Sequence, residues 1–95
     1  MSAKANEIET PLSDIDIVQA LEVSHDLDAS GLRCPLPLLK AKQALHRLKV
    51  GDTLRVVATD GGSERDFHTF ASLSGHAIVY FAKSNGNYYY VLEKN

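Results

Sequence analysis

The fold of this protein is set by residues 23–48, which read VSHDLDASGLRCPLPLLKAKQALHRL. Apolar and polar side chains alternate over residues 23–28, as in a half-buried β-strand, and the Ala-Ser-Gly sequence at 29–31 interrupts them. Leucine and alanine then recur every three or four positions over residues 38–48, which predicts a helix with one apolar face. Gly51 is suited to the left-handed conformation that ends many helices. The stretch therefore predicts a strand, a turn and a helix.

The rest of the chain repeats this alternation and ends in a hairpin. The β-branched residues of 53–59 predict a second strand, and the apolar spacing over 63–74 predicts a second helix. Residues 77–82 and 88–92 predict two further strands. The Asn-Gly pair at 85–86 lies between them and is typical of a tight hairpin turn.

The predicted element order is β-α-β-α-β-β, which indicates an α+β fold. Strand-helix-strand units form parallel pairs with right-handed crossovers, and the final hairpin adds an antiparallel pair. We therefore expect a two-layer α/β sandwich, in which two helices cover one face of a mixed four-stranded sheet. A chain of 95 residues has room for one such domain, which we place at residues 23–95.

Residues 1–22 form an acidic N-terminal extension. Residues 1–28 carry one Lys against seven Asp and Glu, whereas residues 29–95 carry nine Lys and Arg against five. Ser13 and Asp16 have the spacing of a helix-capping signal. We expect the extension to be partly disordered or to contain a short helix.

The composition narrows the classes of protein. The net charge of −2 does not indicate nucleic-acid or anionic-membrane binding, and the apolar runs are too short to span a bilayer. One cysteine cannot form an internal disulfide, a CxxC pair or a thiolate metal cage. No secretory leader is evident, so we expect a cytoplasmic protein. We also expect it to be monomeric and to need no metal or cofactor.

Cys34 occurs where the first predicted turn becomes a helix. Pro35 is suited to the first helical position, which would place Cys34 at or next to the N-cap, facing the positive end of the helix dipole. Pro37 has no N–H, so the amide of Leu36 is the main candidate to donate to a thiolate. Arg33 adds a neighbouring positive charge. These features predict a thiol pKa below the free value of about 8.5.

A lone cysteine can also be a small buried apolar residue, but the charged and proline neighbours of Cys34 are poor core material. A dithiol oxidoreductase needs a second cysteine, and the four histidines show no pattern typical of a catalytic base or a metal site. The remaining chemistry is group carriage: a thiolate accepts a sulfane sulfur as a persulfide and passes it on. The competing hypothesis is a non-catalytic regulatory or protein-interaction module.

The stretch at residues 27–37, LDASGLRCPLP, strongly resembles the Cys-Pro-x-Pro signature region of the TusA/SirA-like sulfur-carrier family. The resemblance continues through residues 51–54, 58–60 and 65–66 and covers about residues 25–93. It implies a sulfurtransferase-type persulfide carrier rather than a stand-alone enzyme.

The resemblance also implies roles and partners. Cys34 would carry the sulfur, and Pro35 and Pro37 would be the motif prolines. A cysteine desulfurase or another protein would donate sulfur, and a downstream protein would accept it. Members serve tRNA 2-thiouridine synthesis, molybdenum-cofactor synthesis or sulfur oxidation. Gly61 stands where some members have proline, and the acidic extension is longer than in compact members, so the pathway stays open.

Two further groups of residues are candidates for the site. The carboxyl ends of parallel strands share one sheet edge, so the loop of Asp60, Gly61, Gly62 and Ser63 should lie near Cys34 and could bind an anion. The alternative is a plain turn before a helix capped by Ser63. Separately, Lys40 and Lys42 could dock acidic partners, or could simply form a solvated helix face.

Overall fold

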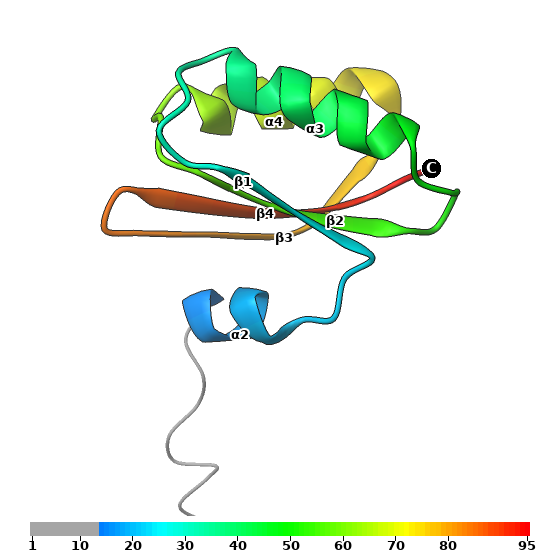
Figure 1. Ribbon diagram of the computed structural model, residues 1–95, viewed down its shortest axis with the longest axis horizontal. Helices are drawn as coiled ribbons and strands as arrows, with labels where there is room; N and C mark the ends of the chain where they lie inside the picture. The colour runs from blue at the N-terminus through cyan, green and yellow to red at the C-terminus, as the bar shows by residue number, and fades with distance from the viewer. Residues whose placement is uncertain (1–13) are drawn as a thin grey trace, which may run out of the picture.

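The computed structural model describes residues 14–95, which form a sheet with helices on both faces (Figure 1). The elements in chain order are α2 (Asp14–Ala20), β1 (His25–Ala29), α3 (Leu36–His46), β2 (Thr53–Ala58), α4 (Ser63–Ser74), β3 (Ala77–Ser84) and β4 (Asn87–Glu93). The capping signal predicted at Ser13 lies outside the described residues. No helix within residues 14–95 has the length and apolarity needed to cross a membrane.

The sheet is mixed, with the strand order β1-β2-β4-β3. β1 pairs with β2 in parallel, and β4 pairs antiparallel with both β2 and β3. Asn85 and Gly86 both have positive φ, at 54° and 81°, as a tight hairpin turn with these residues requires. Helices α3 and α4 lie side by side on one face (Figure 1). The predicted α+β fold and mixed four-stranded sheet are confirmed.

The main core lies between the sheet and these two helices. Ala41 and Leu45 of the predicted apolar stripe are buried, at 0% and 2% exposure, and they meet the alternate buried residues of β2. Phe67 of α4 stacks on Tyr90 of β4, with ring centroids 4.3 Å apart. Burial raises the pKa of Tyr90 to about 12. This packing fixes the start of α4 against the sheet.

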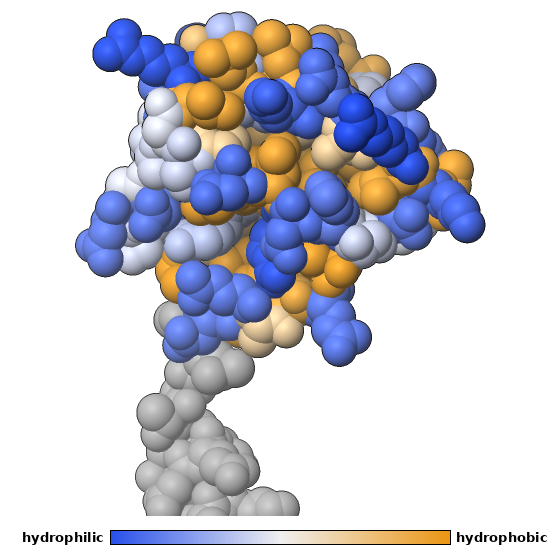
Figure 2. Space-filling model, in the orientation of Figure 1, coloured by the Kyte–Doolittle hydropathy of each residue, from blue (hydrophilic) through white to orange (hydrophobic). Residues whose placement is uncertain are grey.

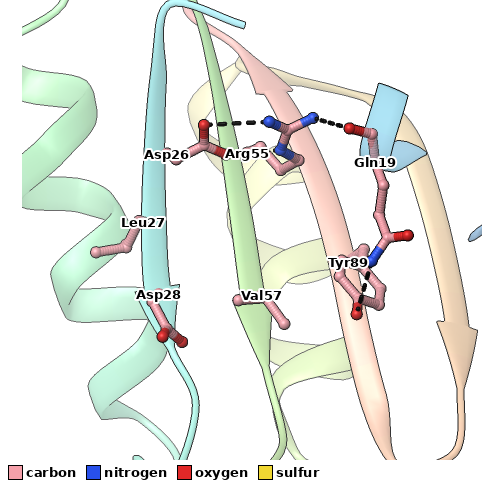
Figure 3. Close-up of a pocket in the computed structure, with 7 residues that line it drawn as sticks. All are labelled: Gln19, Asp26, Leu27, Asp28, Arg55, Val57 and Tyr89. Carbon is pink, nitrogen blue, oxygen red and sulfur yellow. Dashed lines mark hydrogen bonds and ion pairs between the residues drawn. The ribbon is translucent and has the colours of Figure 1, made fainter. Parts of the chain in front are cut away.

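Helix α2 lies on the opposite face of the sheet (Figure 1). Its buried Val18 packs on Ala82 and Val91. One nitrogen of Arg55 on β2 donates to three carbonyls at the end of α2 and in the following turn, at 2.8–3.0 Å. Its Nε is 2.6 Å from Asp26. Figure 3 shows Arg55 between Asp26 and the Gln19 carbonyl. The guanidinium thus satisfies carbonyls that the helix leaves unpaired. The described part of the extension is therefore held on the face that α3 and α4 do not cover.

Candidate functional site

Cys34 is exposed in the connection between β1 and α3. Helix α3 begins at Leu36, and Pro35 is its N-cap residue, so the prediction that Pro35 is the first helical residue is wrong. The amide of Leu36 donates to the carbonyl of Arg33 at 2.8 Å. That turn places Cys34 before the N-cap and occupies the donor predicted for its sulfur. The second motif proline, Pro37, is buried at the start of the helix.

The sulfur of Cys34 instead has an acidic partner. Its thiol donates to Oδ2 of Asp66 in α4, with Sγ and Oδ2 2.5 Å apart. This hydrogen bond raises the pKa of the Cys34 thiol, and desolvation by neighbouring atoms and the negative charges of Asp66 and Asp60 add to the increase. The positive charge of Arg65 opposes the increase. The predicted lowering of the thiol pKa is therefore wrong, because these acidic side chains come from the second strand-helix unit.

The loop between β2 and α4 lies against Cys34, as the parallel pairing of β1 and β2 predicts. A Cβ atom placed on Gly62 would be 3.3 Å from Cys34 Cβ and 3.5 Å from Sγ. Asp60 closes the loop, since its Oδ2 accepts the Gly62 N–H at 3.0 Å. Gly61 is exposed on the other side of the turn, where an added Cβ atom would lie 3.4 Å from the Tyr88 hydroxyl. Gly62 therefore allows the close approach of the loop to the sulfur.

Ser63 does not cap α4. The N-cap residue is Gly62, and no side chain caps the helix. The hydroxyl of Ser63 is instead 2.8 Å from the Tyr90 hydroxyl, and Ser63 is 1% exposed. The capping prediction is wrong because the core gives this hydroxyl a partner. Ser63 thus anchors the loop, while Gly62 faces Cys34.

The two lysines lie on different sides of α3. Lys42 lines a groove of about 600 Å³ between α3 and α4, together with Arg65, Asp66 and Phe70. Its ammonium lies 5.4 Å from the centre of the Phe70 ring. Lys40 lines a separate recess beside β1. The structure therefore brings Lys42, but not Lys40, into the groove that contains Asp66.

The surface around the helices is partly apolar. Figure 2 shows hydrophobic patches between hydrophilic side chains over the helix layer. Leu36 and Leu39 of α3 are each 45% exposed, and Leu73 of α4 is 82% exposed. Within residues 14–95, no group of three or more His, Cys, Asp or Glu side chains is placed to hold a metal ion. The site is thus an open thiol bordered by apolar and charged surface.

The fold and the site define a class: a small α+β protein that presents a lone thiol beside the carboxyl end of a strand in a helix-covered mixed sheet. Residues 25–94 match the family described as Sulfurtransferase TusA. The sulfur carrier protein TusA of Allochromatium vinosum is 39% identical over 74 residues, which span 78% of this chain and 97% of the relative. The chain therefore belongs to the TusA family of sulfur carriers, and the predicted family is confirmed.

A solved structure supports the same assignment. The crystal structure of a SirA-like protein from Desulfitobacterium hafniense matches with a TM-score of 0.64 and 28% sequence identity. The match covers 73% of this chain and 95% of the other chain. The match thus supports the α+β fold over most of this chain and nearly all of the other chain.

Asp66 and Arg65 are the two residues at the site whose roles the sequence reasoning missed. The Arg-Asp pair was part of the family resemblance, but nothing in its local sequence indicates contact with Cys34. The contact joins residues 32 positions apart and depends on the packing of α4 beside α3. A family signature that contains both the cysteine and the Arg-Asp pair is the signal that could have suggested it.

Proposed function

We propose that this protein carries sulfur as a persulfide on Cys34 and relays it from a donor protein to an acceptor protein. The observation that supports the proposal is the position of the chain's one cysteine, exposed on a turn between the carboxyl end of β1 and the start of α3. A thiol presented in this way can meet the reactive sulfur of a second protein. Family membership supports the same chemistry.

The transfer requires two successive partners. In the first step Cys34 attacks the outer sulfur of a donor persulfide, the donor S–S bond breaks, and the donor leaves as a thiol. In the second step an acceptor thiol attacks the outer sulfur on Cys34 and releases the Cys34 thiol. We propose a cysteine desulfurase as the donor class and a downstream sulfur-relay protein as the acceptor. The relay would serve tRNA 2-thiouridine synthesis or another sulfur pathway in the cytoplasm.

Intact-mass measurement tests the proposal. We expect incubation with a cysteine desulfurase and cysteine to add the mass of one sulfur atom to the wild-type chain. Cys34→Ser removes the only thiol and should show no gain. A wild-type chain that gains no sulfur while the desulfurase turns over would contradict the proposal and favour the regulatory or protein-interaction module.

We further propose that the basic residues of α3 dock acidic partner surfaces. Lys42→Glu reverses a charge in the groove beside Asp66, so we expect it to slow sulfur uptake by about tenfold and to weaken its salt dependence. Lys40→Glu is the matched variant on the other side of the helix, and we expect a smaller effect from it. Uptake rates measured at several salt concentrations test this. Wild-type rates and salt dependence in both variants would contradict the docking proposal.

A further inference from the structure

We infer that Asp66 is a catalytic residue, which takes the proton of the Cys34 thiol as its sulfur attacks the donor persulfide and returns that proton to the departing donor thiolate. The inference rests on the proposed role of Cys34 as the sulfur-bearing residue. It assigns to this carboxylate a chemical role beyond that of a neighbour that holds the thiol in place.

The geometry supports direct proton transfer. Asp66 Oδ2 is in direct hydrogen-bond contact with Cys34 Sγ, which is the contact that a general base requires. The carboxylate is held by the rigid start of α4: the Asp66 N–H donates to the carbonyl of Gly62, and the adjacent Phe67 is fully buried. Because the Gly62 loop leaves no free space for a side chain beside Cys34, the loop and the helix together hold the two reacting groups.

The charges around the thiol explain why a base is needed. Asp60 in the loop and Asp66 on α4 both raise the pKa of the Cys34 thiol, and only partial compensation comes from Arg65. Lys42 of α3, a further positive charge, lines the groove that contains Asp66. The thiol is therefore protonated at neutral pH, whereas the thiolate is the nucleophile in sulfur exchange. The proton must leave as the bond forms, and Asp66 is the group in contact with it.

The step balances in atoms and electrons. The S–H electron pair of Cys34 forms the new S–S bond to the outer sulfur of the donor, while the proton moves to Oδ2. The donor S–S bond breaks, and its electron pair leaves with the inner sulfur of the donor. Protonated Asp66 then returns the proton to that thiolate. A thiol and a persulfide are exchanged for a persulfide and a thiol, and no external oxidant or reductant is consumed.

Docking of the donor would favour the proton transfer. Exclusion of water from a carboxylate disfavours its charged form and raises its affinity for a proton. Cys34 is exposed before docking, and a partner seated over the groove that Asp66 and Leu73 line would remove water from the carboxylate. The thiol would then be unreactive in solution and would become nucleophilic only against a docked donor.

Two measurements on Asp66→Asn separate this role from a structural one. The first is the pH dependence of Cys34 alkylation by iodoacetamide. Loss of the carboxylate removes the main cause of the raised thiol pKa, so the profile should shift to lower pH and alkylation at neutral pH should become several-fold faster. The second is single-turnover sulfur uptake from a persulfide-loaded cysteine desulfurase, which should become about a hundredfold slower.

Two further variants control the experiment. Asp66→Glu keeps a carboxylate on α4 and should recover part of the uptake rate. Glu64→Gln removes a negative charge from the same helix, where the side chain pairs with Lys83 rather than with the thiol, and both measurements should match the wild type.

Opposite changes in the two rates are the result that supports the inference. If Asp66→Asn accelerates uptake together with alkylation, Asp66 acts only by keeping the Cys34 thiol protonated, and the inference is wrong. If the variant slows both reactions without a shift of the alkylation profile, the change is a loss of local structure, which also overturns the inference. A wild-type chain that takes no sulfur from the desulfurase would contradict the proposed function instead, whatever the thiol titration shows.

Discussion

Gly62→Ala should slow sulfur uptake at Cys34 by about tenfold, because the neighbours of the added methyl group must move by a few tenths of an ångström, and a displacement of about 1 Å can cost about a hundredfold in rate. The added methyl group would lie 3.0 Å from Asp60 Oδ2 and 3.3 Å from Cys34 Cβ. Gly62 has a φ of −70°, which alanine adopts without strain, so the effect comes from this crowding alone. The loop or the cysteine turn must move, and the contact of Cys34 with Asp66 is disturbed.

Gly61→Ala is the matched control. Its methyl group would meet only the Tyr88 hydroxyl, at 3.4 Å, on the far side of the same turn. We expect its uptake rate to stay close to that of the wild type. Single-turnover uptake from a persulfide-loaded desulfurase compares the two variants. Equal rates in both would mean that the close approach of the loop is not needed for transfer.

Phe67→Ala should lower the free energy of unfolding by about 3–5 kcal/mol, the usual cost of truncating a buried aromatic side chain. Phe67 is fully buried and stacks on Tyr90, so its removal leaves a cavity between α4 and the sheet. A domain of this size has a free energy of unfolding of about 5–15 kcal/mol, so the variant should lose much of its stability. Urea denaturation followed by circular dichroism measures the change.

Leu73→Ala on the same helix is the control for Phe67→Ala. Leu73 is 82% exposed, and surface substitutions of this kind usually change stability by less than about 0.5 kcal/mol. Similar losses in the two variants would show that α4 is not held to the sheet by the Phe67–Tyr90 stack. Because Phe67 follows Asp66 directly, the same stack also fixes the carboxylate that contacts Cys34.

The sequence predicted those features that depend on local pattern. The spacing of apolar residues identified α3, including the buried Ala41 and Leu45, and the Asn-Gly pair identified the hairpin. The parallel pairing of β1 and β2 also placed the Gly62 loop beside the cysteine correctly. These features follow from helix periodicity, turn chemistry and the handedness of crossovers, which act over short stretches of chain.

The electrostatics of the thiol could not be predicted in this way. The sequence reasoning counted the helix dipole and Arg33, which are close to Cys34 along the chain, and so predicted a lowered thiol pKa. Asp66 determines the direction of the thiol's pKa shift, and it reaches the sulfur only after α4 has packed beside α3. Ser63 was misjudged for a similar reason, since the Tyr90 hydroxyl that it meets comes from β4.

The most direct test of sulfur carriage by Cys34 is to locate the transferred sulfur on the wild-type chain. The protein is loaded by a cysteine desulfurase with cysteine, its sulfur groups are blocked with iodoacetamide, and its peptides are sequenced by mass spectrometry. We predict one additional sulfur atom on the peptide that contains Cys34, between the cysteine and the blocking group. Recovery of that peptide with an ordinary blocked thiol, from a reaction in which the desulfurase has turned over, would contradict the account.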